Sequence, residues 1–267
     1  MSFIIDPYRF NTCPAEALAF IAAAGITDAT QRQAICTLVR DLQTYGIWTK
    51  MKAIYPFVGG TSSTHKWNLK DPRDLDAAFR LVFSGGWTHS STGALPNGTN
   101  GYADTFLTLS AAGAFNNCHL SYYSRTNNLD SNTRVEIGRG NGTASGYQNL
   151  YLRLSNSTPN IGGSAGSRSI SVINSNSAGF GVNSSTSSTS QKTYLNGSLV
   201  SSTTATQTAS AANLNIFIGS QGNSTIASEF SNRECAFASI GDGLTDTEAA
   251  NLYIAVQKYQ TTLGRQV

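Results

Sequence analysis

The stretch TYLNGSLV, residues 193–200, gives the most direct indication of the fold class of this chain. It places the dipeptide Asn196-Gly197 between two apolar runs. An Asn-Gly pair favours a two-residue type I′ turn, because both positions of that turn need positive φ. The stretch therefore predicts a β-hairpin.

Short β-like runs of this kind follow one another along most of the chain. The segment 155–190 is rich in Ser, Asn and Gly, but Ile170, Val172, Phe180 and Val182 recur there with a period of two. We therefore interpret it as polar-faced strands and not as a linker. Many short strands with frequent turns predict a sandwich or barrel. The runs lie at 51–58, 78–83, 102–107, 119–123, 134–137, 150–154, 169–173, 192–195, 214–218 and 235–240.

Two short helices are predicted before the strands. Pro14 suits the first turn of a helix, and Gly25 offers a left-handed stop after it. The sequence DATQ at 28–31 is a variant capping box that opens a second helix, which Gly46 ends. The short Gly turn between the helices predicts an antiparallel α-hairpin over residues 14–47.

One further helix is predicted at the end of the chain. The sequence TDTE at 245–248 is a capping box, an apolar stripe with helical spacing follows it, and Gly264 ends it. We thus expect a mainly β protein: an arm over 1–13, the helical hairpin, and a β-sandwich over 48–267 that includes this short helix.

The arm contains five large apolar residues and shows no helical stripe: Phe3, Ile4, Ile5, Tyr8 and Phe10. Exposed apolar segments usually mark an interface, so the arm is a candidate attachment segment. The alternative is that it packs across the sandwich as an extra strand.

The composition excludes several classes of protein. Charged residues make up 12% of the 267 residues, against roughly 25% in an average protein. The 12 Phe, 11 Tyr and 3 Trp argue against disorder. A net charge of +3 without a basic patch argues against nucleic-acid binding. Since no apolar run approaches ~18 residues, membrane insertion is not expected.

The chain shows no catalytic or metal-binding motif. Asp71, Asp74 and Asp76 flank a proline and suit turns or caps better than a general acid and nucleophile. The sequence has no G-x-S-x-G motif, no C-x-x-C pair, and three widely separated histidines. We therefore expect no enzyme activity, no metal and no cofactor. A carboxylate pair assembled from distant positions stays open.

Aromatic residues provide the candidates for sugar binding. In SGGWTHSSTG, residues 84–93, alternation places Trp87 and His89 on the same side of an extended stretch. Tyr122 lies in another predicted strand. Such rings can stack on a sugar while Asn and Ser supply hydrogen bonds. The alternative is that Trp87 and Tyr122 are core residues, because large aromatics are usually mostly buried.

The last third of the chain resembles the end of a laminin-G-like, concanavalin-A-like jelly roll. The resemblance implies a β-sandwich of that type, in a family whose members often bind glycans. It rests on YLNG at 194–197, NIFIGS at 215–220, the run 230–240 and GLTDTEAANLY at 243–253.

The chain as a whole resembles a group of tailed-phage virion proteins. The matching stretches are GIWTKMKAIYPFVGG at 46–60, THKWNLK at 64–70, residues 83–103 and TLGRQV at 262–267. The resemblance implies assembly in the host cytoplasm and a place on the virion surface, as a capsid decoration, head fibre or tail appendage. Other virion proteins would then be partners, and glycans of the host surface or the environment would be candidate ligands. Self-association stays open.

Two alternatives to this function remain. One is a polysaccharide-cleaving enzyme, a glycoside hydrolase or lyase, on the same fold. The other is a purely structural cement or adaptor protein. Because the sequence shows no coiled-coil or β-helix shaft, we expect a compact module.

The expected redox state of the four cysteines follows from the compartment in which the protein would assemble. Cys13, Cys36, Cys118 and Cys235 should be free thiols if the protein assembles in a bacterial cytoplasm. Cys13 and Cys36 lie on or beside the two predicted N-terminal helices and could approach each other.

Overall fold

The predicted hairpin joins strand β12 (Ser190–Leu195) to strand β13 (Ser198–Thr203). In the computed structural model, Leu195 pairs with Ser198, and the two turn residues between them have φ of 49° and 78°. Positive φ at both positions confirms the predicted turn. The structure describes residues 13–128, 130–140, 146–211, 213–223 and 226–267.

We expect Gly197→Val to lower the free energy of unfolding by at least about 1 kcal/mol, because a β-branched residue resists positive φ. A Cβ at Gly197 would also lie 2.8 Å from Cδ1 of Tyr253. Urea denaturation of both proteins measures the difference. The matched control is Gly25→Val, since Gly25 also has positive φ but nothing lies within 4 Å of its Cβ position. Equal losses for the two variants would contradict the Tyr253 contact.

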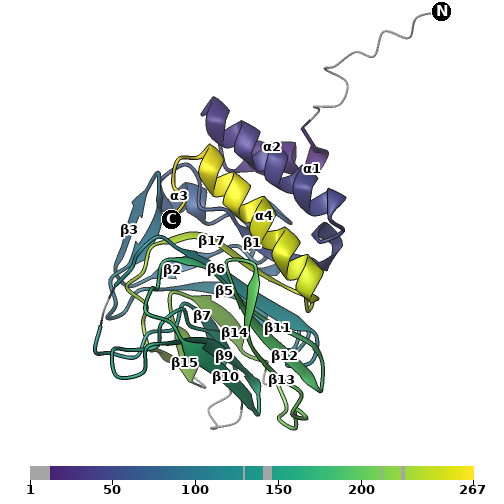
Figure 1. Ribbon diagram of the computed structural model, residues 1–267. Coiled ribbons are helices and arrows are strands. Elements are labelled where there is room, and N and C mark those ends of the chain that lie inside the picture. Colours follow the sequence, from purple (N-terminus) through teal and green to yellow (C-terminus); the bar gives the residue numbers. More distant parts are fainter. Residues whose placement is uncertain (1–12, 129, 141–145, 212, 224–225) are drawn as a thin grey trace, which may run out of the picture.

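The strands form two antiparallel sheets that face each other as a sandwich (Figure 1). The first sheet has the order β13, β12, β11 (Gly179–Ser187), β6 (Cys118–Ser124), β17 (Cys235–Gly241), β4 (Gly93–Pro96) and β3 (Trp87–Ser90), with β1 (Met51–Tyr55) beside β17. The second has the order β10 (Arg168–Ile173), β9 (Asn160–Gly166), β8 (Tyr147–Leu150), β7 (Ile137–Gly140), β14 (Asn215–Ile218), β5 (Tyr102–Thr108) and β2 (Val82–Ser84), with β15 (Gln221–Asn223) and β16 (Ile226–Ser228) beyond β7. The predicted mainly β sandwich is thereby confirmed.

Three predicted strands are displaced from their expected positions. The run 78–83 begins with a 3₁₀ turn, η2 (Asp76–Ala78), so that β2 starts at Val82. β7 starts at Ile137 and includes Gly138 and Gly140. These two positions need glycine, because a Cβ there would collide with the side chains of Asn149 and Tyr147 on β8. β8 ends at residue 150, where the sequence predicted a strand to begin.

The helices begin and end as predicted. They are α1 (Ala15–Ala23), α2 (Ala29–Thr44) and α4 (Asp246–Thr262). Asp28 caps α2 by accepting a hydrogen bond from Gln31 N, and Thr245 and Glu248 form the capping box of α4. Gln31 does not complete a capping box, because its Oε1 accepts a hydrogen bond from Gly59 N, 3.0 Å away. It therefore ties α2 to the loop after β1.

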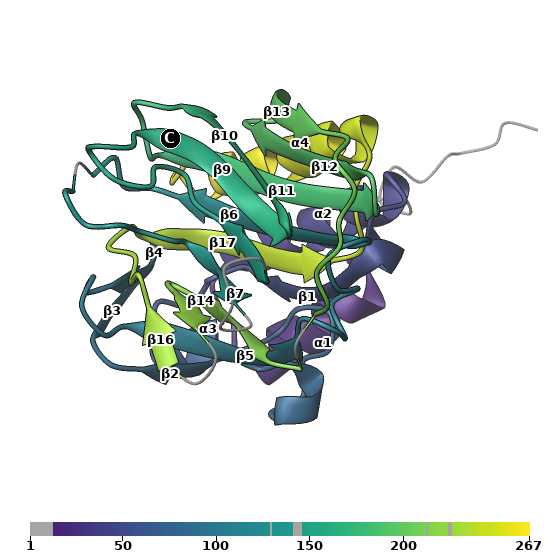
Figure 2. The same cartoon turned by 90° about the horizontal axis from the view of Figure 1, so that it is seen from below.

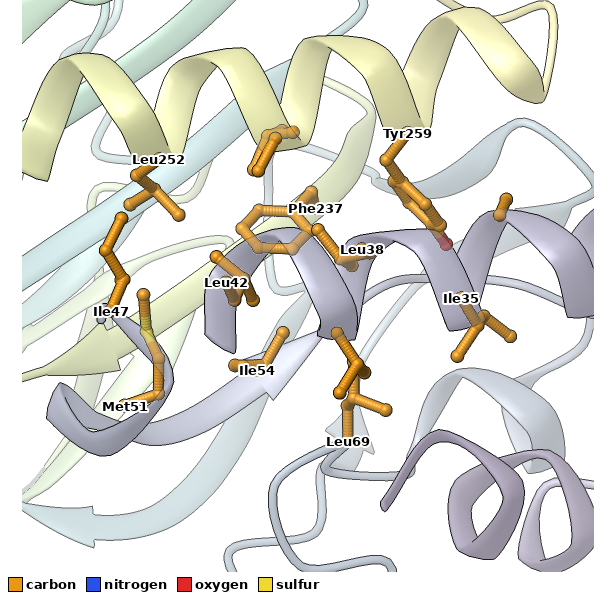
Figure 3. Packing of buried hydrophobic residues seen from close by; sticks show 14 of the residues in the cluster. Ile35, Leu38, Leu42, Ile47, Met51, Ile54, Leu69, Phe237, Leu252 and Tyr259 are labelled. Carbon is orange, nitrogen blue, oxygen red and sulfur yellow. The ribbon is translucent and has the colours of Figure 1, made fainter. Parts of the chain in front are cut away.

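The three helices form a layer on the outer face of the first sheet (Figure 1). Leu38 and Leu42 of α2 and Leu252 of α4 meet Phe237 of β17 and Ile54 of β1 in one buried cluster (Figure 3). At the predicted boundary between hairpin and sandwich, residues 47 and 48 are themselves buried in this cluster. The hairpin thus shares a core with the sandwich. A second cluster fills the space between the sheets.

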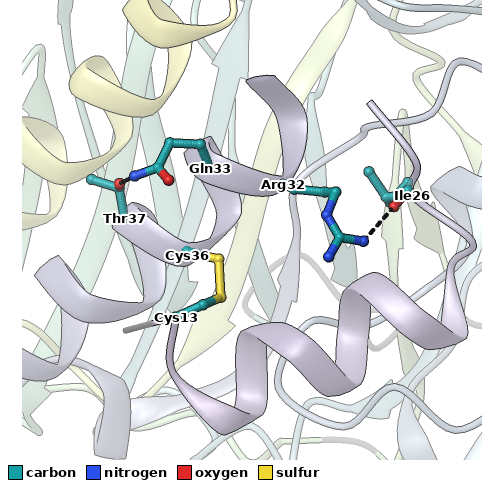
Figure 4. The surroundings of a disulfide bond; sticks show 6 residues. All are labelled: Cys13, Ile26, Arg32, Gln33, Cys36 and Thr37. Carbon is teal, nitrogen blue, oxygen red and sulfur yellow. Dashed lines mark hydrogen bonds between the residues drawn. A yellow bond between two sulfur atoms is a disulfide. The ribbon is translucent and has the colours of Figure 1, made fainter. Parts of the chain in front are cut away.

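The expectation of four free thiols is wrong, because Cys13 and Cys36 form a disulfide (Figure 4). The hairpin brings Cys13, two residues before α1, against Cys36 in the middle of α2, with the two Cα atoms 4.9 Å apart. That separation lies within the range that a disulfide needs. Cys118 and Cys235 are buried thiols, as predicted.

The attachment residues Phe3, Ile4, Ile5, Tyr8 and Phe10 lie outside the described residues, so their role stays a prediction. Among the helices that the structure describes, none is long and apolar enough to cross a membrane.

Candidate functional site

Two of the predicted sugar-binding residues meet on one flank of the sandwich. This flank is bordered by β2, the edge strand of the second sheet, and β3, the edge strand of the first. Phe83 of β2 packs edge-on against Trp87 and His89 of β3, with ring centroids 5.2 and 4.6 Å away. Trp87 and His89 stack on each other with centroids 6.2 Å apart. Their predicted placement on one side of the strand is confirmed.

Trp87 is anchored to both sheets. Its Nε1 donates hydrogen bonds to the carbonyl oxygens of Ser84 and Tyr102, 3.1 and 3.2 Å away. The far edge of the ring lies over Gly219, where a Cβ would come within 2.8 Å of it. The indole is partly buried and packs against the inter-sheet core. Trp87 therefore supports the flank and exposes only part of its ring.

His89 is paired with His65, their Nδ1 atoms being 2.9 Å apart. Since Gly60 N donates to Nε2 of His65, the hydrogen-bond network assigns the shared proton to Nδ1 of His65. Burial has the largest effect on His65 and lowers its pKa. The neighbouring His89 and Arg265 lower it further, to about 3. Burial also lowers the pKa of His89. Both imidazoles are therefore neutral at pH 7, and the aromatic group carries no charge.

A groove of about 260 Å³ adjoins this aromatic group and shares Phe83 with it. One wall is α3 (Ser62–His65), a single turn that a Thr61–Thr64 capping box holds in place. The other wall is β2 and the residues before it. The lining residues are Ser62, Ser63, Lys66, Arg80, Leu81, Val82 and Phe83.

The charges of the groove are balanced by ion pairs. Lys66 lies 2.5 Å and Arg80 2.8 Å from opposite carboxylate oxygens of Asp74. Arg80 also pairs with Asp76 at 2.8 Å. These hydrogen bonds lower the pKa of Asp74. Two of the three acidic residues that the sequence assigned to turns or caps thus hold the cations at the groove.

A second pocket, of about 210 Å³, lies at the same end of the molecule. The segment after β1 contributes to both, because Val58 lines this pocket and Ser62 and Ser63 line the groove. The other lining residues are Asp28, Thr30, Gln31, Ser91, Thr92 and Leu263. Both hollows are thus built around the segment 58–66.

The prediction that Tyr122 contacts a sugar is wrong. Tyr122 is completely buried, and its hydroxyl donates to the carbonyl oxygen of Arg233 at 2.7 Å. It lies on β6, a central strand whose alternate residues face the two cores. Tyr122 points between the sheets, while Tyr123 points toward the helices.

Sequence reasoning missed Phe83, Lys66 and Arg80. The groove joins residues 62–66 to 80–83, and no motif in either stretch indicates that they meet. Among the described residues, no group of three His, Cys, Asp or Glu side chains is placed to hold a metal ion.

No family model and no curated protein matches the chain. Solved structures do resemble it. Domain 4 of AbnA, a GH43 extracellular arabinanase from Geobacillus stearothermophilus in complex with arabinotriose, is 14% identical with a TM-score of 0.51, over 76% of this chain and 98% of that one. A mutant of Trypanosoma rangeli sialidase that displays trans-sialidase activity is 12% identical with a TM-score of 0.55, over 86% and 39%.

A third similar structure is of botulinum neurotoxin type C, whose cell entry is dependent upon interaction with two ganglioside molecules. It is 12% identical with a TM-score of 0.55, over 80% of this chain and 53% of that one. The chain thus spans about half or less of the neurotoxin and sialidase chains. At these identities the likeness concerns the fold alone. Together with the two antiparallel sheets, it defines a mainly β protein of the β-sandwich class.

Proposed function

We propose that this protein is a non-enzymatic surface module of a phage virion that binds glycans in the groove between α3 and β2. The observation that carries the glycan proposal is the composition of this groove. Phe83 and Val82 supply an apolar wall, and the opposite wall carries the hydroxyls of Ser62 and Ser63. Pockets that bind small ligands combine apolar walls with a few polar groups that fix orientation, and a sugar ring needs both.

The balanced charges indicate the class of glycan. Lys66 and Arg80 are offset by Asp74 and Asp76, so an anionic sugar would meet no net positive charge. A neutral sugar could bond its hydroxyls to both partners of these ion pairs. We therefore expect neutral glycans as ligands.

The similar structures add support by analogy of fold. Two of them are described with a saccharide or a ganglioside as ligand: domain 4 of AbnA and botulinum neurotoxin type C. Since one fold hosts many functions, the analogy raises the expectation of glycan binding and identifies no site. The laminin-G-like, concanavalin-A-like form of the sandwich belongs to this proposal and rests on the sequence resemblance.

A glycan array followed by titration calorimetry tests the binding site. We expect the wild-type protein to bind, and Ser62→Trp to bind at least about tenfold more weakly, because the indole would fill the groove. The control is Ser188→Trp, an exposed serine in the β11–β12 turn, which should bind like the wild type. Thermal melts confirm that both variants fold. Equal binding by all three proteins would place the site elsewhere, and the absence of any bound glycan would reject the proposal.

The non-enzymatic part of the proposal has its own test. Asp74 and Asp76, the carboxylates beside the groove, are both held in ion pairs. The alternative, a glycoside hydrolase or lyase, would release reducing ends from bacterial polysaccharides. We expect no release, and turnover that disappears on mutating one carboxylate would support the enzyme.

The virion location rests on the sequence resemblance. Immunogold labelling of particles, viewed by electron microscopy, would show position and copy number. Glycan binding by the labelled particles would support a glycan-binding appendage. Particles that carry the protein but bind no glycan would instead support a purely structural cement or adaptor protein.

A further inference from the structure

The segment 59–65, which contains α3, has few hydrogen bonds to the rest of the protein. It lies beside β2 and β3 in both views (Figures 1 and 2). Among the described residues, two hydrogen bonds join it to distant parts of the chain. Gly59 N donates to Oε1 of Gln31, and the imidazole of His65 bonds to that of His89. The His65–His89 contact is therefore one of two such bonds that hold α3 in place.

The hydrogen bonds of the two histidines run in one direction. Gly60 N donates to Nε2 of His65 at 3.3 Å, and Nδ1 of His65 donates to Nδ1 of His89 at 2.9 Å. A proton added to His65 would occupy Nε2 and oppose the N–H of Gly60. A proton added to His89 would occupy Nδ1 and oppose the N–H of His65, and moving that second proton to Nε2 transfers the conflict to Gly60. Either addition therefore places two donors face to face.

The surroundings of His65 disfavour a positive charge. His65 is 1% exposed, and its ring packs edge-on against that of Phe57, with centroids 5.4 Å apart. Arg265 faces it from the C-terminal segment and adds a positive charge. Protonation would thus place a second cation in a buried position.

The surroundings of His89 supply no counter-charge. Phe83 and Trp87 pack against it with uncharged rings. Glu234 accepts a hydrogen bond from the hydroxyl of the residue after His89, and it is already paired with Arg125 at 2.9 Å. Among the hydrogen bonds of the described residues, none joins a carboxylate to either imidazole. No neighbouring acid therefore compensates a proton gained by the pair.

We propose that the His65–His89 pair is a pH-sensitive switch: protonation breaks the pair and releases the segment 59–65, which removes the α3 wall of the groove. Gly59 and Gly60 begin this segment with φ of 87° and 82°, so two residues with few backbone restrictions supply the hinge. Once released, the histidines would titrate near the ordinary pKa of about 6.5. The closed segment is thus fully stable above that pH and loses stability as the pH falls below it. The effect on ligand binding rests on the proposed glycan function, whereas the release of the segment does not.

Hydrogen–deuterium exchange followed by mass spectrometry tests the switch without a ligand. The protection factor compares the observed exchange rate with the intrinsic rate at the same pH, so the pH dependence of the exchange chemistry cancels. The protection factor of residues 59–65 should fall at least about tenfold between about pH 7.5 and pH 5. The reason is that the pKa of His65 is about 3 in the closed segment, so each pH unit below 6.5 favours opening by up to about tenfold. The ion pair of Lys66 with Asp74 beside α3 persists at that pH, since the pKa of Asp74 is lowered.

The double variant His65→Gln with His89→Gln should abolish this fall, because its amides can continue the hydrogen bonds and do not titrate. If its segment 59–65 is unprotected already at neutral pH, His89→Gln alone decides. With one titrating ring left, its fall should be smaller than that of the wild type.

The matched control is His119→Gln. His119 is also buried, its pKa is lowered to about 4, and it bonds to Ser239 of β17 and to the carbonyl oxygen of Asp242. This variant should keep the fall in residues 59–65. In the wild type, β17 should stay better protected than this segment at both pH values, because the switch opens the segment and not the sheet.

Three results would overturn the switch. They are an unchanged protection factor in the wild type, an equal fall in the wild type and the double variant, and a segment 59–65 as well protected as β17, which would open only with the whole protein. Glycan titration at both pH values separates the two proposals. Loss of a bound glycan at the lower pH in the wild type, but not in the double variant, would support the switch. A protein that binds no glycan at either pH would reject the proposed function, and the exchange result would still decide the switch.

Discussion

Glu136→Ala is expected to lower the free energy of unfolding by about 3–5 kcal/mol, because it leaves a buried charge without its partner. Glu136 and Arg233 are 0% and 1% exposed in their side chains and form an ion pair at 2.5 Å. The second carboxylate oxygen accepts from Leu152 N, and Nη2 of Arg233 donates to the carbonyl oxygen of Arg153, both at 2.7 Å. The pair therefore joins the residue before β7 to the segment before β17, and both partners are bonded to the backbone that follows β8.

Urea denaturation measures this loss, and two further variants interpret it. The double variant Glu136→Leu with Arg233→Met removes both charges and should be more stable than Glu136→Ala, since a buried pair can be replaced by apolar residues at little cost. Asp41→Ala breaks a pair with Lys258, which is 55% exposed, and should cost at most about 1 kcal/mol. A double variant no more stable than the single one would contradict the unpaired charge as the cause.

Arg265→Ala should be similarly destabilising, by about 3–5 kcal/mol, because a buried network of hydrogen bonds would lose its donor. Arg265 is 1% exposed. Its Nη1 donates to the carbonyl oxygen of Phe57 at 2.7 Å, and its Nη2 donates to those of Pro56 and Ala236 at 2.9 and 3.0 Å. Its Nε donates to Oε1 of Gln260. The side chain thus ties the C-terminal segment to β17 and to the loop after β1.

The effect of Arg265→Ala should also reach the candidate site, because the loop that Arg265 holds continues into α3, one wall of the groove. Chemical denaturation gives the stability, and the glycan titration gives the effect on the groove. Arg73→Ala is the control. Arg73 is exposed, its one ion pair within the described residues is with Asp71, and its loss should change neither readout appreciably. An unfolding midpoint for Arg265→Ala equal to that of the control would show that the network contributes nothing.

Local features of the fold could be predicted because they depend on residues a few positions apart. Positive φ at Asn196 and Gly197 is a property of those two residues and their turn. The capping box of α4 needs Thr245 and a glutamate three residues later. The same holds for the alternation that places Trp87 and His89 on one side of a strand.

Predictions failed where the outcome depends on how segments distant in the sequence pack against each other. Tyr122 and Tyr123 are equally large and apolar, and their sequence does not say whether a strand has one or two covered faces. The helices cover the outer face of β6, so both tyrosines are buried in different cores. Cys13 and Cys36 were predicted to be free thiols from the expected compartment. The packing of the helical hairpin instead brings them within bonding distance.

The sequence by itself thus determined the β-rich class, the turn at 196–197, and the starts and stops of the three long helices. These depend on backbone preferences and hydrogen bonds within about four residues. Only the tertiary structure decided which side chains meet: the groove, the Cys13–Cys36 bond and the pairing of Glu136 with Arg233. The physical reason is that such contacts join segments up to 97 residues apart. Their geometry follows from how the sheets and helices pack as a whole, which no local pattern encodes.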